Sequence, residues 1–235
     1  MRRRFTPRSA MACLLASAAL LVTGFAPTSY DELCLQGRRY LEEKQSERAI
    51  ESYTQAIKLS AEQSMAYFGR ALAYKDKGEF DLAIADCSEA IRLSPKEAVP
   101  YSAYLLRAES HEANGDLERA LADFTEAIER DASRAQSYLA RARIHHKKGG
   151  MDRAIYDFTK AAELDPQDMT AVLGRAQAYS DNEDYDRAIE DYSEAIRRNG
   201  KVAGYYFLRA KVRFIQKDYD RVIADCGEAL RMDPA

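Results

Sequence analysis

The chain has 235 residues, of which 31% are charged and 46% are hydrophobic, a composition that is ordinary for a soluble helical protein. The formal net charge is −3, but Arg2, Arg3, Arg4 and Arg8 precede the first acidic residue, so the remainder of the chain carries −7. An acidic body argues against nucleic acid as the main partner, because phosphate binding needs a basic stripe.

Residues 1–29 begin with the four arginines and continue with sixteen apolar, uncharged residues from Met11 to Ala26. This arrangement is typical of a secretory signal peptide, and it is short for a membrane-spanning helix. Because Pro27 follows a weak cleavage site, an uncleaved anchor is an alternative, and so is an N-terminus without a targeting role. We expect an exported protein, either periplasmic or anchored and facing outward, that touches a membrane only through this segment.

From residue 30 onward the sequence repeats with a period of 34 residues, and residues 135–168 align with residues 169–202 without a gap. Ala98, Val99 and Pro100 are extra residues between the second and third units. The same comparison divides the chain into six units, which are 30–63, 64–97, 101–134, 135–168, 169–202 and 203–235.

Each unit contains two apolar runs at helical spacing. In the fourth unit Gly149-Gly150 separates the runs, and Asp165-Pro166 ends the second one. Small residues at unit positions 8, 20 and 27 would let two helices approach closely, and a large residue at position 24 would fill the gap beside them. Position 27 is alanine in every unit: Ala56, Ala90, Ala127, Ala161, Ala195 and Ala229.

This pattern resembles the tetratricopeptide repeat (TPR) family, with its 34-residue period, small residue at position 8, alanines at 20 and 27, aromatic residue at 24 and proline at 32. The resemblance implies an all-α fold, a right-handed TPR solenoid of six helix-turn-helix repeats after the hydrophobic signal or anchor segment. It also implies a concave face that usually binds peptides, but it does not identify the ligand.

Repeats 2 to 6 share a polar pair, arginine at position 7 and aspartate at position 23. Repeat 1 lacks both and has Gln36 and Ser52 instead, so we predict that the two positions touch within one repeat. Arginine suits such a pair because its planar fork can bind a carboxylate through two hydrogen bonds. The predicted pairs are Arg70–Asp86, Arg107–Asp123, Arg141–Asp157, Arg175–Asp191 and Arg209–Asp225.

The resemblance implies that positions 2, 5, 9, 12 and 13 line the concave face. Position 5 is apolar throughout, and the flanking positions are polar or charged, which suits an extended peptide or an amphipathic helix. An alternative is that position 5 packs into the neighbouring repeat. We predict partner-binding residues at position 5, with one arginine from position 9: Phe68, Leu105, Leu139, Leu173, Phe207 and Arg143. The Lys and Asn residues with which some TPR proteins grip a C-terminal carboxylate are absent.

No pattern in the sequence predicts an enzyme, a cofactor or a metal site. The chain lacks a Gly-rich phosphate loop, an HExxH motif and a G-x-S-x-G motif. His111 and His145 replace tyrosine at position 11, so we interpret them as structural. Cys87 and Cys226 replace the aromatic residue at position 24, and we expect both to be buried and too far apart for a disulfide.

The last repeat ends without an additional polar helix, so we expect Val222, Ile223 and Leu230 to be exposed on one side. The sequence therefore predicts a non-enzymatic scaffold or adaptor that binds a protein or peptide on the concave face. The alternative is a structural subunit of a self-assembling envelope complex, a homo-oligomer joined through the C-terminal repeat.

Overall fold

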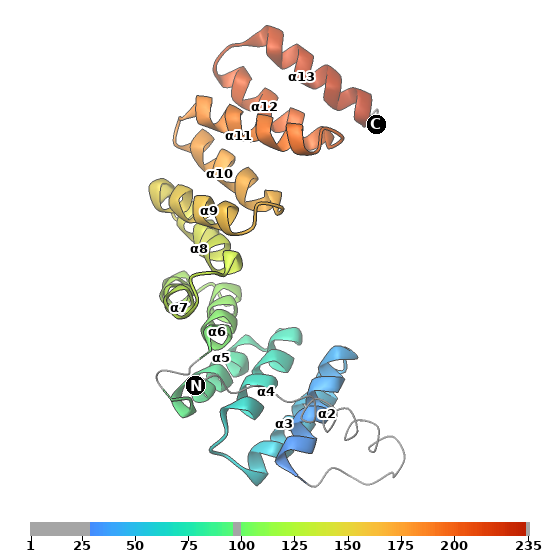
Figure 1. Cartoon of the computed structure of the whole chain (residues 1–235), viewed down its shortest axis with the longest axis vertical. Coiled ribbons are helices and arrows are strands. Elements are labelled where there is room, and N and C mark those ends of the chain that lie inside the picture. The colour runs from blue at the N-terminus through green and yellow to red at the C-terminus, as the bar shows by residue number, and fades with distance from the viewer. Residues whose placement is uncertain (1–28, 96–99, 234–235) are drawn as a thin grey trace, which may run out of the picture.

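The computed structural model describes residues 29–95 and 100–233 (Figure 1). The predicted signal or anchor therefore lies outside the described residues, except for Ser29, and so do Ala98 and Val99 of the insertion. Among the described residues, no helix combines the length and the apolar character that crossing a membrane requires.

The described chain is all-α, and its helices form six antiparallel pairs. The first helix of each pair has 13 residues: α2 (Tyr30–Glu42), α4 (Ser64–Asp76), α6 (Tyr101–Ala113), α8 (Ala135–Lys147), α10 (Met169–Asp181) and α12 (Ala203–Ile215). The second has 14 residues: α3 (Ser46–Leu59), α5 (Phe80–Leu93), α7 (Leu117–Arg130), α9 (Met151–Leu164), α11 (Tyr185–Arg198) and α13 (Tyr219–Met232).

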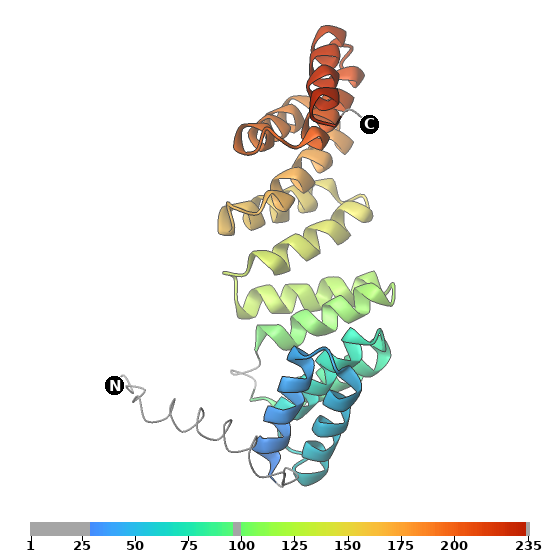
Figure 2. The ribbon, with the colours of Figure 1, turned by 90° about the vertical axis from the view of Figure 1, so that its right-hand side faces the viewer.

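The pairs stack in chain order into an elongated solenoid, with α2–α3 at one end and α12–α13 at the other (Figure 2). Each pair packs on its neighbours in the stack, so the core is a series of local clusters along the long axis. No pair could bury its apolar faces alone, and stability comes from stacking on the neighbours.

Local signals in the sequence account for the starts of several helices and for the turns between them. Ser29 and Glu32 form a capping box at the start of α2. Aspartate side chains cap three of the second helices, as Asp184 does by accepting a hydrogen bond from the backbone N–H of Arg187. The turn inside each pair needs one residue in the left-handed region, for example Gly78 with φ 77°, where glycine avoids the steric cost of a Cβ.

Size complementarity holds successive repeats together. The Tyr53 ring packs so closely on α4 that a Cβ on Gly69 would overlap it. At the next interface Cys87, a small residue at position 24, packs against the larger Leu106, which is the residue equivalent to Gly69. The alanines at positions 8, 20 and 27 are almost all fully buried, as the small-residue pattern predicted.

Candidate functional site

The predicted arginine–aspartate pairs form in all five repeats and connect the two helices of each pair. In repeat 4, Nε and Nη2 of Arg141 each donate to a different oxygen of Asp157, both at 2.8 Å. The other four pairs have the same bidentate geometry, with distances between 2.7 and 3.0 Å. In repeat 1 the Ser52 hydroxyl donates to the amide oxygen of Gln36 at 3.0 Å, so the two positions touch there as well.

Sequence reasoning missed the third partner of each arginine, which lies in the preceding repeat. Nη1 of Arg141 donates to the hydroxyl of Thr125 at 3.0 Å, and the remaining arginines do the same. The acceptors all lie at position 25: Thr54, Ser88, Thr125, Thr159 and Ser193. The signal was present in the sequence, because these hydroxyls recur with the repeat. The ladder therefore holds each repeat together and also links it to the one before.

Hydrogen bonding to aspartate raises the pKa of Arg70, Arg107, Arg141 and Arg175 above the usual arginine value. The guanidinium groups are mostly buried and already neutralised by the aspartates. The ladder is therefore a structural feature and offers no free anion site.

The concave face is formed by the first helices of the pairs. Successive first helices contact one another, as α2 does with α4, α4 with α6 and α8 with α10. The residues predicted to bind a partner lie on this set of helices, at positions 5 and 9.

The predicted residues do not form one continuous apolar surface. Leu105, Leu139 and Leu173 are half-buried and pack against the core clusters, which matches the alternative in which position 5 supports the stacking. Phe207 is 57% exposed, and Arg143 is also exposed. Of the predicted residues, Phe68 lines a defined hollow.

That hollow is an apolar cavity of about 440 Å³ between α2 and α4. A volume of this size is typical of small-molecule sites and accommodates bulky side chains of a peptide. Met65 at its rim is 63% exposed. The lining residues are Asp31, Cys34, Leu35, Arg38, Leu41, Tyr53, Met65, Phe68, Gly69 and Leu72. We call this cavity the N-terminal groove.

The Tyr53 ring contributes to the wall of the N-terminal groove from α3. Small residues on both neighbouring first helices make room for this ring, because a Cβ would meet it at Gly69 and a Cβ on Gly37 would lie 2.8 Å from its Cε2. Burial raises the pKa of the Tyr53 hydroxyl to about 12, so the phenol stays neutral at physiological pH. Tyr53 therefore adds no charge to the groove, whose charged lining residues are Asp31 and Arg38.

Charged pairs mark where the apolar part of the concave face ends. Lys75 on α4 forms an ion pair with Glu109 on α6, and Nε2 of His146 lies 2.7 Å from a carboxylate oxygen of Asp181. Arg38 and Glu42 form an exposed pair at the edge of the groove. The apolar cavity of the face thus lies in repeats 1 and 2, and repeat 6 carries two further exposed rings, Phe207 and Phe214.

The surroundings of the two histidines at position 11 fit a structural role. His111 is buried, with Nε2 3.8 Å from Asp123, and burial lowers its pKa. Burial also lowers the pKa of His145. Within the described residues, no group of three or more His, Cys, Asp or Glu side chains is arranged to hold a metal ion.

The two cysteines at position 24 differ in burial, and the expectation that Cys226 is buried was wrong. Cys87 is fully buried, and burial raises the pKa of its thiol to about 12. Cys226 is only half-buried, because no described helix packs on the outer side of α13. The described cysteines are free thiols.

The outer face of α13 carries large exposed apolar residues. Ile223 is 72% exposed and Leu230 is 63% exposed, and the ring of Phe214 packs edge-to-face on Tyr219. Ile189 and Ile196, the residues equivalent to Ile223 and Leu230 in repeat 5, are half-buried. Val222 is half-buried rather than exposed.

Six stacked helical hairpins with small residues at their contacts define a helical-repeat solenoid. A family model described as tetratricopeptide repeat matches residues 34–98, 105–168 and 173–235. The chain belongs to the tetratricopeptide repeat family, whose members are generally non-catalytic scaffolds for protein–protein interaction.

Two curated relatives match short parts of the chain. The small glutamine-rich tetratricopeptide repeat-containing protein 2 of Saccharomyces cerevisiae is 35% identical over 72 residues, which are 31% of this chain and 21% of that protein. The DnaJ homolog subfamily C member 7 homolog of Schizosaccharomyces pombe is 38% identical over 61 residues, which are 25% of this chain and 13% of that protein. The chain thus spans less than a quarter of either relative.

Solved structures share the fold at low sequence identity. The C-terminal part of a TPR repeat-containing protein from Cytophaga hutchinsonii is 18% identical with a TM-score of 0.77, covering 85% of this chain and 78% of that one. YrrB, described as a TPR protein with an unusual peptide-binding site, is 16% identical with a TM-score of 0.69, covering 79% and 94%. The Cut9–Hcn1 assembly is 20% identical with a TM-score of 0.65, covering 95% and 43%.

Proposed function

We propose that the protein is an adaptor that binds an apolar peptide or helix of a partner protein in the N-terminal groove. The observation that carries the proposal is the apolar cavity of about 440 Å³ between α2 and α4. TPR proteins bind protein or peptide partners, and the structurally similar YrrB is described as having a peptide-binding site. The groove combines an apolar wall with a charged edge, as helix-binding and peptide-binding grooves do.

The predicted site residues have different roles under this proposal. Phe68 anchors the ligand in the groove, and Leu105, Leu139 and Leu173 mainly support the stacking from the half-buried positions in which they lie. Arg143 and Phe207 are exposed farther along the concave face and contact a ligand that extends beyond repeat 2.

A library of displayed peptides, screened against the full chain, tests the proposal. We expect selected peptides to contain bulky apolar residues, and Met65→Asp to weaken their binding by about tenfold or more, because it places a charge on the apolar rim. Met65 is 63% exposed, so its substitution leaves the fold intact.

Tyr156→Ala is the matched control, since Tyr156 is an exposed ring on a second helix, away from the groove. Phe207→Ala shows whether the ligand extends to repeat 6. Equal affinities for the wild type and Met65→Asp would contradict a binding site in the N-terminal groove.

Self-assembly through the C-terminal repeat is a second candidate function, favoured by the exposure of Ile223 and Leu230. We expect the wild type to form concentration-dependent oligomers in sedimentation experiments, and Ile223→Asp/Leu230→Asp to remain monomeric. A wild-type monomer at high concentration would contradict it.

We also propose that residues 1–29 direct export, through cleavage or as an anchor, on the evidence of their sequence. Mass spectrometry of the protein from its native membrane and soluble fractions tests this. A mature N-terminus near residue 27 indicates cleavage, and an intact N-terminus in the membrane fraction indicates an anchor. An intact chain in the soluble cytoplasmic fraction contradicts both.

A further inference from the structure

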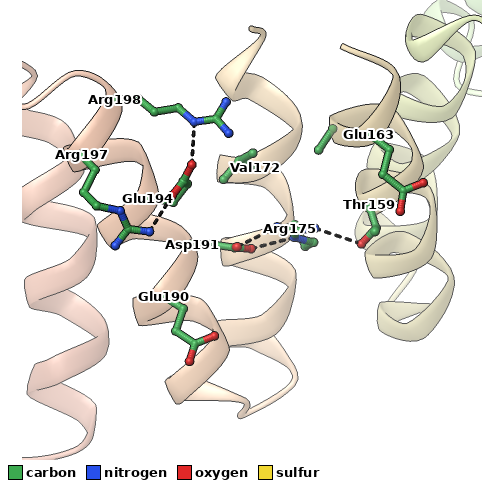
Figure 3. Close-up of a pocket in the computed structure, with 10 residues that line it drawn as sticks. Thr159, Glu163, Val172, Arg175, Glu190, Asp191, Glu194, Arg197 and Arg198 are labelled. Atoms are coloured by element: carbon green, nitrogen blue, oxygen red, sulfur yellow. Dashed lines mark hydrogen bonds and ion pairs between the residues drawn. The ribbon is translucent and has the colours of Figure 1, made fainter. Parts of the chain in front are cut away.

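A second hollow, of about 400 Å³, lies where α9, α10 and α11 meet (Figure 3). The second helices α9 and α11 form its walls, and α10 forms its floor. Val172 and Arg175 come from the floor and Ala162 comes from α9. Glu163, Glu190, Glu194, Arg197 and Arg198 form its charged rim.

The other repeats show what normally occupies this place. Repeats 2, 3, 4 and 6 have tyrosine at position 4, and its ring lies against the guanidinium group of the ladder arginine three residues later. The guanidinium carbon lies 5.6 to 5.9 Å from the ring centre in the pairs Tyr67–Arg70, Tyr104–Arg107, Tyr138–Arg141 and Tyr206–Arg209. This is the geometry of a cation–π interaction.

At two of these interfaces an isoleucine of the preceding repeat forms the other wall. Ile91 packs in the same cluster as Tyr104, and Ile128 packs in the same cluster as Tyr138. Both isoleucines are at position 28. Tyrosine and isoleucine together fill the space above the arginine.

At the interface between repeats 4 and 5 both residues are smaller. Val172 replaces the tyrosine and Ala162 replaces the isoleucine, so Arg175 has no ring of its own repeat above it. Arg175 nevertheless donates two hydrogen bonds to Asp191, both at 2.8 Å, and one to the hydroxyl of Thr159 at 3.3 Å (Figure 3). The guanidinium group is therefore already oriented for a ring that the chain does not supply.

The rim of the hollow suits the polar end of a phenol. Glu194 already accepts hydrogen bonds from Arg197 at 2.5 Å and from Arg198 at 2.7 Å (Figure 3). Glu190 lines the same hollow and can accept a hydrogen bond from a hydroxyl group. The apolar side chains of Val172 and Ala162 beside charged groups match a tyrosine side chain, whose body is apolar and whose tip is polar.

We propose that this hollow binds a tyrosine side chain of a partner polypeptide, which completes the stacking on Arg175 that four other repeats make internally. The site is separate from the N-terminal groove and does not depend on the function proposed for it.

Titration of the full chain with p-cresol, which is the tyrosine side chain alone, tests the proposal. Methyl resonances of Val172 and Ala162 in NMR spectra should shift and saturate at millimolar probe concentrations. 4-Methylcyclohexanol has a similar shape but no π face, and it should bind about threefold or more weakly, given the size of a cation–π contribution. A short peptide with a single tyrosine between glycines should bind at least as tightly as p-cresol.

Two variants fill the hollow with the residues of the other repeats. Val172→Tyr and Ala162→Ile should each abolish the p-cresol shifts and raise the midpoint of thermal unfolding. If Val172→Tyr does not fold, Ala162→Ile alone tests the proposed site. Tyr138→Val/Ile128→Ala is the matched opposite change, which reproduces the pair Val172 and Ala162 and should create a second p-cresol site above Arg141. Binding that persists in the folded filling variants, equal affinity for the two probes, or exclusion of the tyrosine peptide would overturn the proposal.

Discussion

Asp157 shows how strongly one residue can control the stability of a repeat. Its side chain is 2% exposed and makes two hydrogen bonds to Arg141, which is itself largely buried. Asp157→Ala leaves the guanidinium buried without its counter-ion, and we expect the free energy of unfolding to fall by about 3–5 kcal/mol. Urea denaturation followed by circular dichroism measures the loss.

The control for this experiment removes both charges. Arg141→Met/Asp157→Leu replaces the pair by apolar residues of similar size and should cost much less than the single substitution. If Asp157→Ala lowers the free energy of unfolding by less than about 1 kcal/mol, the pair contributes no more than a surface ion pair. That result would contradict a strong contribution of the buried pair to the stability of the repeat.

His111 makes stability depend on pH in a direction that follows from its burial. Burial lowers its pKa although Asp123 opposes the shift, so the unfolded chain binds a proton more readily than the folded chain. Stability is therefore full above the ordinary histidine pKa of about 6.5 and is lost as the pH falls below it.

We expect His111→Tyr, which restores the residue of repeats 1, 2 and 5, to reduce the drop in unfolding temperature between about pH 8 and about pH 5. Part of the drop should remain, because burial lowers the pKa of His145 in the same way. Circular dichroism melts at both pH values measure the effect. An identical drop in the two proteins would show that His111 does not titrate differently on unfolding.

Packing between helices is decided by pairs of residues, as Tyr53 and Gly69 illustrate. A Cβ on Gly69 would overlap the Tyr53 ring, so Gly69→Ala forces the ring to move. We expect a net destabilisation of about 1–3 kcal/mol, although alanine is the better helix former by about 1 kcal/mol. Equilibrium unfolding in urea measures the net change.

Gly227 in α13 is the matched control, because a Cβ there would meet nothing within 4 Å. Gly227→Ala should stabilise the protein by about 0.5–1 kcal/mol. Tyr53→Cys should relieve the clash in Gly69→Ala, by analogy with the pair Cys87 and Leu106. Stabilisation by Gly69→Ala alone would show that the ring adjusts freely.

The helices and the ladder were predictable because they depend on residues at fixed spacing. The joint change to Gln36 and Ser52 in repeat 1 correctly indicated which side chains touch, since a pair must change together when one partner is lost. The N-terminal groove was not predictable, because Phe68, Leu105 and Leu173 occupy equivalent positions in the sequence and differ only in how their neighbours pack. The interface that forms the groove combines Gly37, Gly69 and Tyr53 with the small Cys34 at position 5.

At the scale of the whole molecule, stability depends on how tightly each repeat is coupled to the next. In a solenoid the interfaces between neighbours provide that coupling, and weak interfaces let parts of the array unfold separately. The arginine ladder crosses every interface between described repeats through the hydroxyl at position 25, as Arg141 does through Thr125 at 3.0 Å. This hydroxyl also donates to the carbonyl oxygen of Leu121 at 2.8 Å, so its orientation is fixed.

Thr125→Val should therefore weaken the coupling between repeats 3 and 4 while leaving the Arg141–Asp157 pair intact. We expect a loss of about 1.5–3 kcal/mol, the usual size for a hydrogen bond to a charged group, and a broader unfolding transition. Hydrogen exchange should show α6 and α7 opening separately from α8 and α9, whereas in the wild type they open together. Thr125→Ser keeps the hydroxyl and should retain the wild-type coupling, which separates loss of the hydrogen bond from loss of the methyl group. If Thr125→Val leaves the transition as sharp as in the wild type, apolar stacking alone couples the repeats and the cross-repeat bond is incidental.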